Sequence, residues 1–452
     1  MTMLHFASAL LPSGWAHGVR VVVTDGTVAS VMAGVAPQSG DERHQLAIPG
    51  MASLHSHAFQ RGMAGLAEMR DNTADTFWSW REVMYRFALE MTPEDVEIVA
   101  TLLYVEMLER GYTRVGEFHY LHHDRDGRPY ANPAEMASRI AHAARTAGIG
   151  LTMLPSFYAH SSFGGGAPHA GQRRFVCSVE QFARLIDSTR KAMDGLPGAN
   201  AGIAPHSLRA VTPEELADIL PLCESGPIHI HVAEQTREVE DCIAWSGRRP
   251  VEWLLDHAAV DQRWCLIHAT HMTAVETAAL ARSGAVAGLC PITEANLGDG
   301  VFAAREFCGA GGRFGIGTDS NVLVGVTDEL RQLEYGQRLK HRERNVMSGG
   351  SGVSTGRAMF DAALIGGGRA LGQPAFGLAA GARADIVTLD TAHPSLAGRR
   401  GDAVLDGWIF AASTGAIDCV WAGGSKVVES GRHRLHEKAC DRFKATVCRL
   451  AA

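Results

Sequence analysis

The sequence has no long uninterrupted hydrophobic run and no dense cluster of charges of one sign. Residues 1–18, MTMLHFASALLPSGWAHG, lack a basic segment and hold only a short apolar stretch, so they resemble neither a signal peptide nor a membrane span. Lys and Arg number 42 against 49 Asp and Glu, for a formal net charge of -7, and no stretch is basic enough to follow a phosphate backbone. We therefore expect neither a membrane nor a nucleic acid among the partners.

The cysteines form no C-x-x-C pair. Nine of them are scattered along the chain, an odd number that cannot be fully paired in disulfides. This pattern indicates reduced thiols and predicts a cytoplasmic location. Hydrophobic residues make up 46% of the chain and charged residues 20%, as in ordinary globular proteins, and 452 residues predict one large domain with a smaller one.

Eight short apolar or β-branched segments alternate with longer helical patterns, which is typical of repeated βα units. They occupy residues 45–57, 113–120, 150–157, 201–207, 227–234, 263–270, 284–291 and 313–320. Helix starts are marked by Thr92 before Pro93, and by Thr212 with Glu215 three residues later. The pattern predicts the α/β class, with a (β/α)8 TIM-like barrel over residues 49–372.

The two ends of the chain have a different pattern. Apolar residues alternate through 18–32 around an Asp-Gly turn at 25–26, which predicts a hairpin, and residues 377–429 repeat that style. A two-stranded hairpin is marginally stable alone. We therefore expect residues 1–48 and 373–452 to build one small β-sandwich domain, with two separate β appendages as the alternative.

One connection in the barrel is unusually long. Residues 158–176, which begin with YAHSSFGGGAPHAGQRR, follow the third predicted strand and are rich in Gly. A loop of this length in a compact domain is either functional or an insertion. It is accordingly interpreted as a lid over the site or as a simple insertion.

Two H-x-H pairs, at 55–57 and 229–231, lie at the carboxyl ends of predicted strands. With 21 histidines in the chain the motif alone is a weak signal. However, alternate residues of a strand face the same side, and barrel active sites lie at this end. Imidazoles with one carboxylate suit a zinc-like divalent ion. The predicted ligands of one such ion are His55, His57, His231 and Asp319.

Three residues are predicted to be catalytic, two beside these ligands and one, Asp319, that is itself a ligand. Glu234 lies just beyond the fifth strand, where it can shuttle a proton, unless it is an exposed helix-cap carboxylate. His268 ends the sixth strand and is expected to orient the attacking hydroxide, while Asp319 is the second candidate to take its proton. A bound ion lowers the pKa of water from about 16 to about 7. Taken singly, each histidine could be structural, and Asp319 a turn residue. His229 is interpreted as packed inside the barrel.

As a set, these residues resemble the amidohydrolase superfamily, whose barrels carry H-x-H on the first strand, H-x-x-E at the fifth, His at the sixth and Asp at the eighth. The resemblance covers nearly the whole chain, because GLAAGARADIVTLD looks like the strand that returns to the family's β-sandwich. No Lys ends the third or fourth strand to bridge two ions. The resemblance therefore implies one ion and the deaminase branch.

Closer still, SLHSHAFQRGMAG, FWSWRE, GEFHYLHHD, APHSLRAV and HIHVAEQ look like the N-formimino-L-glutamate deiminase family of histidine degradation. That resemblance implies hydrolysis of a small dicarboxylate, N-formimino-L-glutamate, to N-formyl-L-glutamate and ammonia, by a homodimer. The substrate contacts that it implies are Gln60, Arg81, Tyr120, His206 and Arg209. Guanidinium groups suit the two carboxylates, although both arginines could be solvated surface residues.

Two other functions are compatible with parts of this pattern. One is deamination of guanine or another purine or amidine by the same superfamily, and a purine would give the two arginines no carboxylate to bind. The other is a metal-free, non-catalytic scaffold, although such relatives generally lose ligands and none is missing here. The ion is predicted to be zinc, while imidazole also suits iron and manganese.

Overall fold

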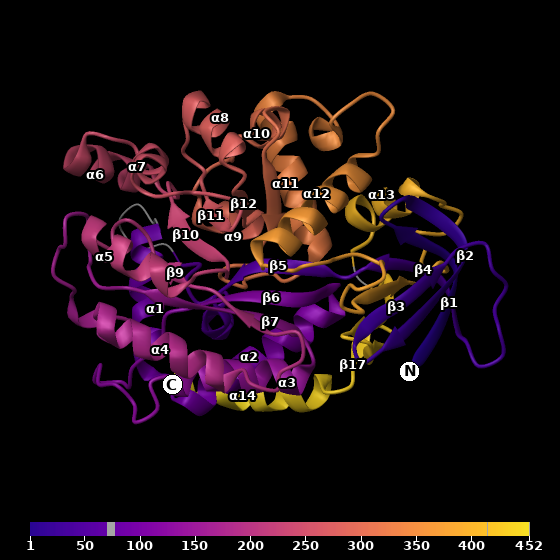
Figure 1. The fold of residues 1–452 in the computed structure, drawn as a ribbon, viewed down its shortest axis with the longest axis horizontal. Coiled ribbons are helices and arrows are strands. Elements are labelled where there is room, and N and C mark those ends of the chain that lie inside the picture. The colour runs from indigo at the N-terminus through magenta and orange to yellow at the C-terminus, as the bar shows by residue number, and fades with distance from the viewer. Residues whose placement is uncertain (70–76, 414, 452) are drawn as a thin grey trace.

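The structure is a computed structural model that describes residues 1–69, 77–413 and 415–451. Figure 1 shows a helix-covered barrel joined at one side to a strand-rich part, where indigo strands from the beginning of the chain lie beside yellow strands from its end. None of the helices in these ranges is long and apolar enough to cross a bilayer.

The barrel is built from parallel strands in two sheets. Their bounds are β5 (Met51–Ser56), β6 (Tyr112–His119), β7 (Gly150–Phe157), β8 (Asn200–Ala201), β9 (Ala204–Pro205), β10 (Ile228–Val232), β11 (Trp264–His268), β12 (Val286–Leu289) and β13 (Arg313–Ile316). One sheet has the order β5-β6-β7-β8, with β9 also paired to β7, and the other the order β10-β11-β12-β13. Isolated bridges Ser56–Asp319 and Ile203–Ile228 join the two sheets. The predicted (β/α)8 class is confirmed, in a form whose hydrogen-bond ladder is interrupted at these two joins.

The first predicted strand, 45–57, is in fact two strands. Residues up to Pro49 belong to β4 (Glu42–Pro49), which pairs with β1 and β14 of the strand-rich part, while β5 enters the barrel. The chain changes partners at Gly50, where a Cβ atom would lie 2.4 Å from Thr113 Oγ1. Both halves of the segment are apolar, so periodicity could not reveal this division.

Helices cover the barrel between its strands. They are α1 (Phe77–Glu90), α2 (Pro93–Glu109), α3 (Glu135–Ala147), α4 (Val179–Ala192), α5 (Pro213–Ile219), α6 (Thr236–Ser246), α7 (Pro250–His257), α8 (Ala274–Ser283), α9 (Pro291–Leu297), α10 (Ala304–Gly309), α11 (Val326–His341) and α12 (Thr355–Ala370), with short 3-10 turns η1 (Ala58–Met63), η2 (Ala170–Gln172), η3 (Leu220–Leu222) and η4 (Val346–Ser348). The predicted N-caps are confirmed, because Thr92 and Thr212 each accept the backbone N–H three residues on, at 3.2 Å.

The chain ends combine into one sheet of order β17-β16-β15-β14-β4-β1-β2-β3. Its other strands are β1 (Thr2–Leu11), β2 (Gly14–Thr24), β3 (Thr27–Met32), β14 (Ile386–Leu389), β15 (Ile417–Ala422), β16 (Ser425–Glu429) and β17 (Arg432–His433). The hairpin predicted around 25–26 is confirmed as β2–β3, and Asp25 and Gly26 both have positive φ. The Val28 N–H donates to Ala382 O at 2.9 Å, so the sheet curls back on itself around a core that includes Phe6 and Trp421.

The last helices return to the barrel. α13 (Asp402–Phe410) packs on α11 and α12, and α14 (His436–Ala451) lies along α2, where His436 Nδ1 is 2.8 Å from Glu109 Oε1. Both lie within the range 373–452 that was predicted for the small domain. The domain limits at 48/49 and 372/373 stay a prediction, as does the lid role of residues 158–176.

Candidate active site

Four predicted ligands converge where the two barrel sheets meet. His55 and His57 come from the end of β5, His231 from β10, and Asp319 from the turn after β13. His231 Nε2 lies 3.1 Å from His55 Nε2 and 3.3 Å from His57 Nε2. Asp319 Oδ1 is 3.3 Å from both His55 Nε2 and His57 Nε2. The four donor atoms thus lie within 4.8 Å of one another, and all four residues are buried.

The surroundings of these imidazoles fit a divalent cation. His57 Nδ1 is 2.8 Å from Phe118 O and His231 Nδ1 is 2.9 Å from His206 O, so each Nδ1–H donates outward and each Nε2 lone pair faces the cluster. Burial lowers the pKa of His55 and of His231 well below the ordinary value, which keeps them neutral. Neutral Nε2 atoms this close repel unless a cation lies between them. Ligands at 2.0–2.1 Å from a tetrahedral ion are themselves about 3.3 Å apart, close to the separations found.

Asn321 locks the turn that carries Asp319. Its Nδ2 donates to Asp319 O at 2.8 Å and to His57 O at 3.1 Å, which joins the end of β5 to the turn after β13. Asp319 itself has a φ of +44°, a left-handed conformation that a non-glycine residue holds only when its neighbours fix it. Asn321 was not among the predicted site residues, although it lies two residues beyond the predicted ligand Asp319.

Beside the cluster, His268 is surrounded by carboxylates. Its Nε2 lies 3.6 Å from Glu234 Oε1 and 3.7 Å from Asp319 Oδ2, and its Nδ1 lies 3.3 Å from Glu294 Oε1. Burial lowers the pKa of His268, but the carboxylates of Glu234, Glu294 and Asp319 outweigh it and raise the pKa to about 10. Burial raises the pKa of Glu234 to about 7, although His268 and Arg209 partly offset it. Near neutral pH His268 therefore holds a proton, while the Glu234 carboxyl group can either take up or release one.

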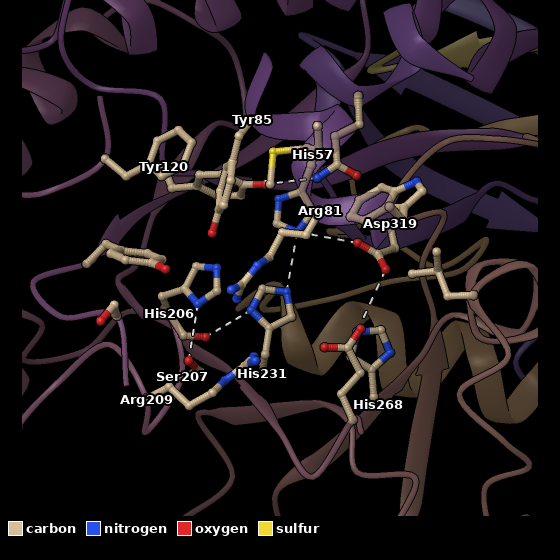
Figure 2. Close-up of a pocket in the computed structure, with 18 residues that line it drawn as sticks. His57, Arg81, Tyr85, Tyr120, His206, Ser207, Arg209, His231, His268 and Asp319 are labelled. Atoms are coloured by element: carbon tan, nitrogen blue, oxygen red, sulfur yellow. Dashed lines mark hydrogen bonds and ion pairs between the residues drawn. The ribbon is translucent and has the colours of Figure 1, made fainter. Parts of the chain in front are cut away.

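These groups open into one cavity, where apolar and aromatic walls surround a few convergent polar groups, as in small-molecule sites. Figure 2 shows His268 and Asp319 on one side, and Tyr120, His206 and Arg209 on the opposite side. All the predicted substrate contacts line this cavity, namely Gln60, Arg81, Tyr120, His206 and Arg209. Of the predicted site residues, His55 alone does not line the cavity and lies behind it, fully buried.

Two of the alternatives raised from the sequence are wrong. Arg209 is only 7% exposed and Glu234 only 4%, so neither is a solvated surface group. The other arginine, Arg81, is half-buried and lines the cavity. The interpretation of His229 is confirmed, since it is buried with its Nε2 2.7 Å from Ala370 O. The side-chain amide of Gln60 already uses its donor, because Gln60 Nε2 donates to Tyr120 OH at 2.8 Å. Its acceptor, Oε1, has no partner among the described residues.

Sequence reasoning missed several lining or supporting residues. They include Tyr85 and Tyr158 in the cavity wall, Gln172 behind them, and Glu238, whose carboxylate accepts the N–H groups of Ala233 and Glu234 at 3.2 and 3.1 Å. The position of Glu238, four residues after Glu234, could have suggested a link on one helical turn. No local pattern marks the other three, because their contact depends on the path of the loop 158–176.

Comparison with known proteins agrees with this architecture. The chain matches the "Amidohydrolase family" over residues 46–427 and the "Formimidoylglutamate deiminase HutF, N-terminal domain" over residues 1–45. It is 50% identical over 445 residues to a formimidoylglutamate deiminase of Pseudomonas aeruginosa, covering 98% of both chains.

The chain is also similar to a solved structure and to a more distant deaminase. A crystal structure of an amidohydrolase from Brucella melitensis superposes with a TM-score of 0.97 at 60% identity, covering 100% of both chains. A 5-methylthioadenosine/S-adenosylhomocysteine deaminase of Natronomonas pharaonis is 28% identical over 356 residues, which is 78% of this chain and 74% of that one. The chain therefore belongs to the amidohydrolase family and, within it, to the formimidoylglutamate deiminases.

Proposed function

We propose that the protein hydrolyses N-formimino-L-glutamate to N-formyl-L-glutamate and ammonia. The observation that carries this proposal is that Arg81 and Arg209 line the same cavity as the His/Asp cluster. Two guanidinium groups match the two carboxylates of this substrate, and the cluster suits hydrolysis of the formimino C–N bond. Guanine and adenosine carry no carboxylate and S-adenosylhomocysteine carries only one, so none of them matches a pair of guanidinium groups as a dicarboxylate does.

Zinc is the ion that we propose for the cluster, held by His55, His57, His231 and Asp319. Three neutral imidazoles and one carboxylate favour it, and each donor atom already faces the others at ligand spacing. When bound, such an ion lowers the pKa of water and polarises the reacting centre. Elemental analysis of protein purified without chelator should find about one zinc per chain.

The remaining chemistry falls to residues of the chain. Arg81 and Arg209 bind the carboxylates, while Gln60 Oε1, which has no partner among the described residues, accepts a hydrogen bond from the formimino N–H. Asp319 or Glu234 takes the proton of the attacking water, and His268 orients its oxygen toward the formimino carbon. Glu234 then delivers that proton to the formimino nitrogen, and the proton of the new hydroxyl group follows it through the same carboxylate, so that ammonia leaves as the C–N bond breaks and the formyl C=O bond forms.

Arg81→Met tests the carboxylate assignment, with Arg86→Met as its control. Both arginines are on α1, but Arg86 is exposed and does not line the cavity. Loss of a hydrogen bond to a charged group costs about 1.5–3 kcal/mol. The Arg81 variant should therefore lose about 10-fold to 150-fold in kcat/KM, and the Arg86 variant almost nothing. Equal activity of the two variants in steady-state ammonia release would contradict the assignment.

Several wider features belong to the same proposal. We propose residues 1–48 and 373–452 as one structural unit and 49–372 as the catalytic barrel. A cytoplasmic location is supported by the nine cysteines, all of which are unpaired thiols. The homodimer is proposed from family resemblance, and sedimentation at micromolar concentration tests it.

A further inference from the structure

Gln172 holds a fixed orientation behind the cavity. It is fully buried at the end of η2, in the loop 158–176. The His169 backbone N–H donates to Gln172 Oε1 at 3.0 Å. A backbone N–H can only donate, so this contact identifies the amide oxygen and leaves the amide nitrogen facing the other way.

The amide nitrogen faces two tyrosines. Gln172 Nε2 lies 2.5 Å from Tyr158 OH and 3.4 Å from Tyr85 OH, and an amide nitrogen carries two protons. Both phenolic oxygens therefore act as acceptors toward Gln172. Even if one hydroxyl also donates to the other, at least one phenolic proton remains and cannot point back at the amide. That proton has to be donated into the cavity, which both tyrosines line.

The two tyrosines lie on the side of the cavity where Arg81 and Arg209 are found. Figure 2 shows the Tyr85 hydroxyl directed toward Arg81 and His206. The Arg81 guanidinium carbon lies 5.4 Å from the Tyr85 ring centroid, and the Tyr158 and His206 rings are 4.6 Å apart. Burial raises the pKa of Tyr158 far above the ordinary range, so its hydroxyl stays protonated as a donor even beside Arg81 and Arg209.

We propose that Tyr85 and Tyr158 are substrate-binding residues that donate hydrogen bonds to a substrate carboxylate, and that Gln172 is the positioning residue that sets their direction. The inference rests on the proposed function and extends it. It gives the loop 158–176 a definite task, because Tyr158 and Gln172 both come from it. Neutral donors beside two guanidiniums favour a carboxylate over a neutral group, so the three residues set specificity.

The decisive variant is Gln172→Glu, which reverses the direction of the hydrogen bonds. A glutamate keeps the size of the side chain and can still accept the His169 N–H, but its second oxygen accepts the phenolic protons. The phenols would then present lone pairs to the substrate carboxylate. Tyr158→Phe is the second variant, since it deletes one donor without adding a buried charge.

Two control variants match these changes. Gln181 accepts the N–H of Ser178 at 2.8 Å in the same kind of capping box, and it does not line the cavity, so Gln181→Glu controls for the new charge. Tyr335 is on α11, 38% exposed and outside the cavity, so Tyr335→Phe controls for the loss of a hydroxyl. Thermal melting of each variant checks that it is folded.

The expected result is a change in KM with little change in kcat. Gln172→Glu should raise KM for formiminoglutamate about 10-fold to 100-fold, and Tyr158→Phe about 10-fold, the range for lost hydrogen bonds to a charged group. kcat should change less than about threefold, because neither residue touches the reacting atoms. The proposal is overturned if KM is unchanged both in the folded Tyr158→Phe variant and in the folded double variant that carries Tyr85→Phe and Tyr158→Phe.

Calorimetric binding of glutarate separates this inference from the proposed function. Glutarate carries two carboxylates and no formimino group, so its affinity reports on carboxylate recognition without turnover. Weaker glutarate binding by Tyr158→Phe supports the inference even if the wild-type chain released no ammonia from formiminoglutamate. Turnover by the wild type together with equal glutarate affinity in both proteins refutes the inference and leaves the function standing.

Discussion

Replacement of Glu234 by Gln is the most informative single change at the catalytic centre. Glu234 is buried, its Oε1 lies 3.6 Å from His268 Nε2, and it is three residues beyond His231 without itself belonging to the four-donor cluster. Gln keeps the shape and a hydrogen-bonding oxygen but cannot carry the proton from water to the leaving nitrogen. Metal content should therefore be unchanged while turnover falls.

The size of the loss follows from the role. A positioned general acid–base group contributes about 10²-fold to 10⁴-fold, or about 2.7 to 5.4 kcal/mol of barrier. The pKa of Glu234 is raised to about 7, chiefly by burial, and the residue must begin as a carboxylate to accept a proton. Wild-type kcat/KM should therefore fall as pH drops below about 7. In the Gln variant kcat/KM should be much lower at every pH, and its decline on the acidic side should be absent.

The assay is steady-state ammonia release between pH 5.5 and 9, with zinc measured in the same samples. Glu240→Gln is the matched control, since Glu240 is on the same helix α6 but exposed. Undiminished turnover by Glu234→Gln, or an unaltered acidic limb, would refute the assigned proton transfer. Loss of metal along with activity would instead indicate that Glu234 supports the ligand cluster.

Two other predictions concern the ion and the packing of the barrel. Removal of metal with dipicolinate should abolish turnover and lower the melting temperature, and added zinc should restore both; full activity in protein shown to be metal-free would contradict this. Gly366→Ala should destabilise the fold by about 1–3 kcal/mol, because its Cβ would lie 1.8 Å from Phe314 O, where α12 meets β13. Gly336→Ala, in α11 with its nearest neighbour at 3.6 Å, should stabilise by about 0.5–1 kcal/mol, and urea unfolding that gave both the same sign would refute the packing argument.

The parts of the site that were predictable are those fixed by local periodicity. Alternate residues of a strand face one side, so the H-x-H pair at 55–57 and His231 could be assigned to the carboxyl ends of strands, where the structure brings their Nε2 atoms together. Capping boxes are equally local, which is why Thr92 and Thr212 were found.

What could not be predicted depends on contacts between distant segments. The division of the first predicted strand into β4 and β5 at Gly50 could not be read from the sequence, because both strands are apolar where they meet. The small domain forms one curled sheet because β4 pairs with both β1 and β14. That pairing depends on tertiary register, so composition could not predict it. Gln172 and Tyr85 are far apart in sequence, and they meet because η2, in the loop 158–176, packs against α1.

The central claim is that a His/Asp cluster facing two arginines makes this protein a deiminase for a small dicarboxylate. The most direct test is ammonia release by the zinc-loaded protein from N-formimino-L-glutamate, guanine, adenosine and S-adenosylhomocysteine at equal concentrations. We predict rapid release from N-formimino-L-glutamate, with N-formyl-L-glutamate as the second product, and none above background from the purines. Release from the purines alone would contradict the account.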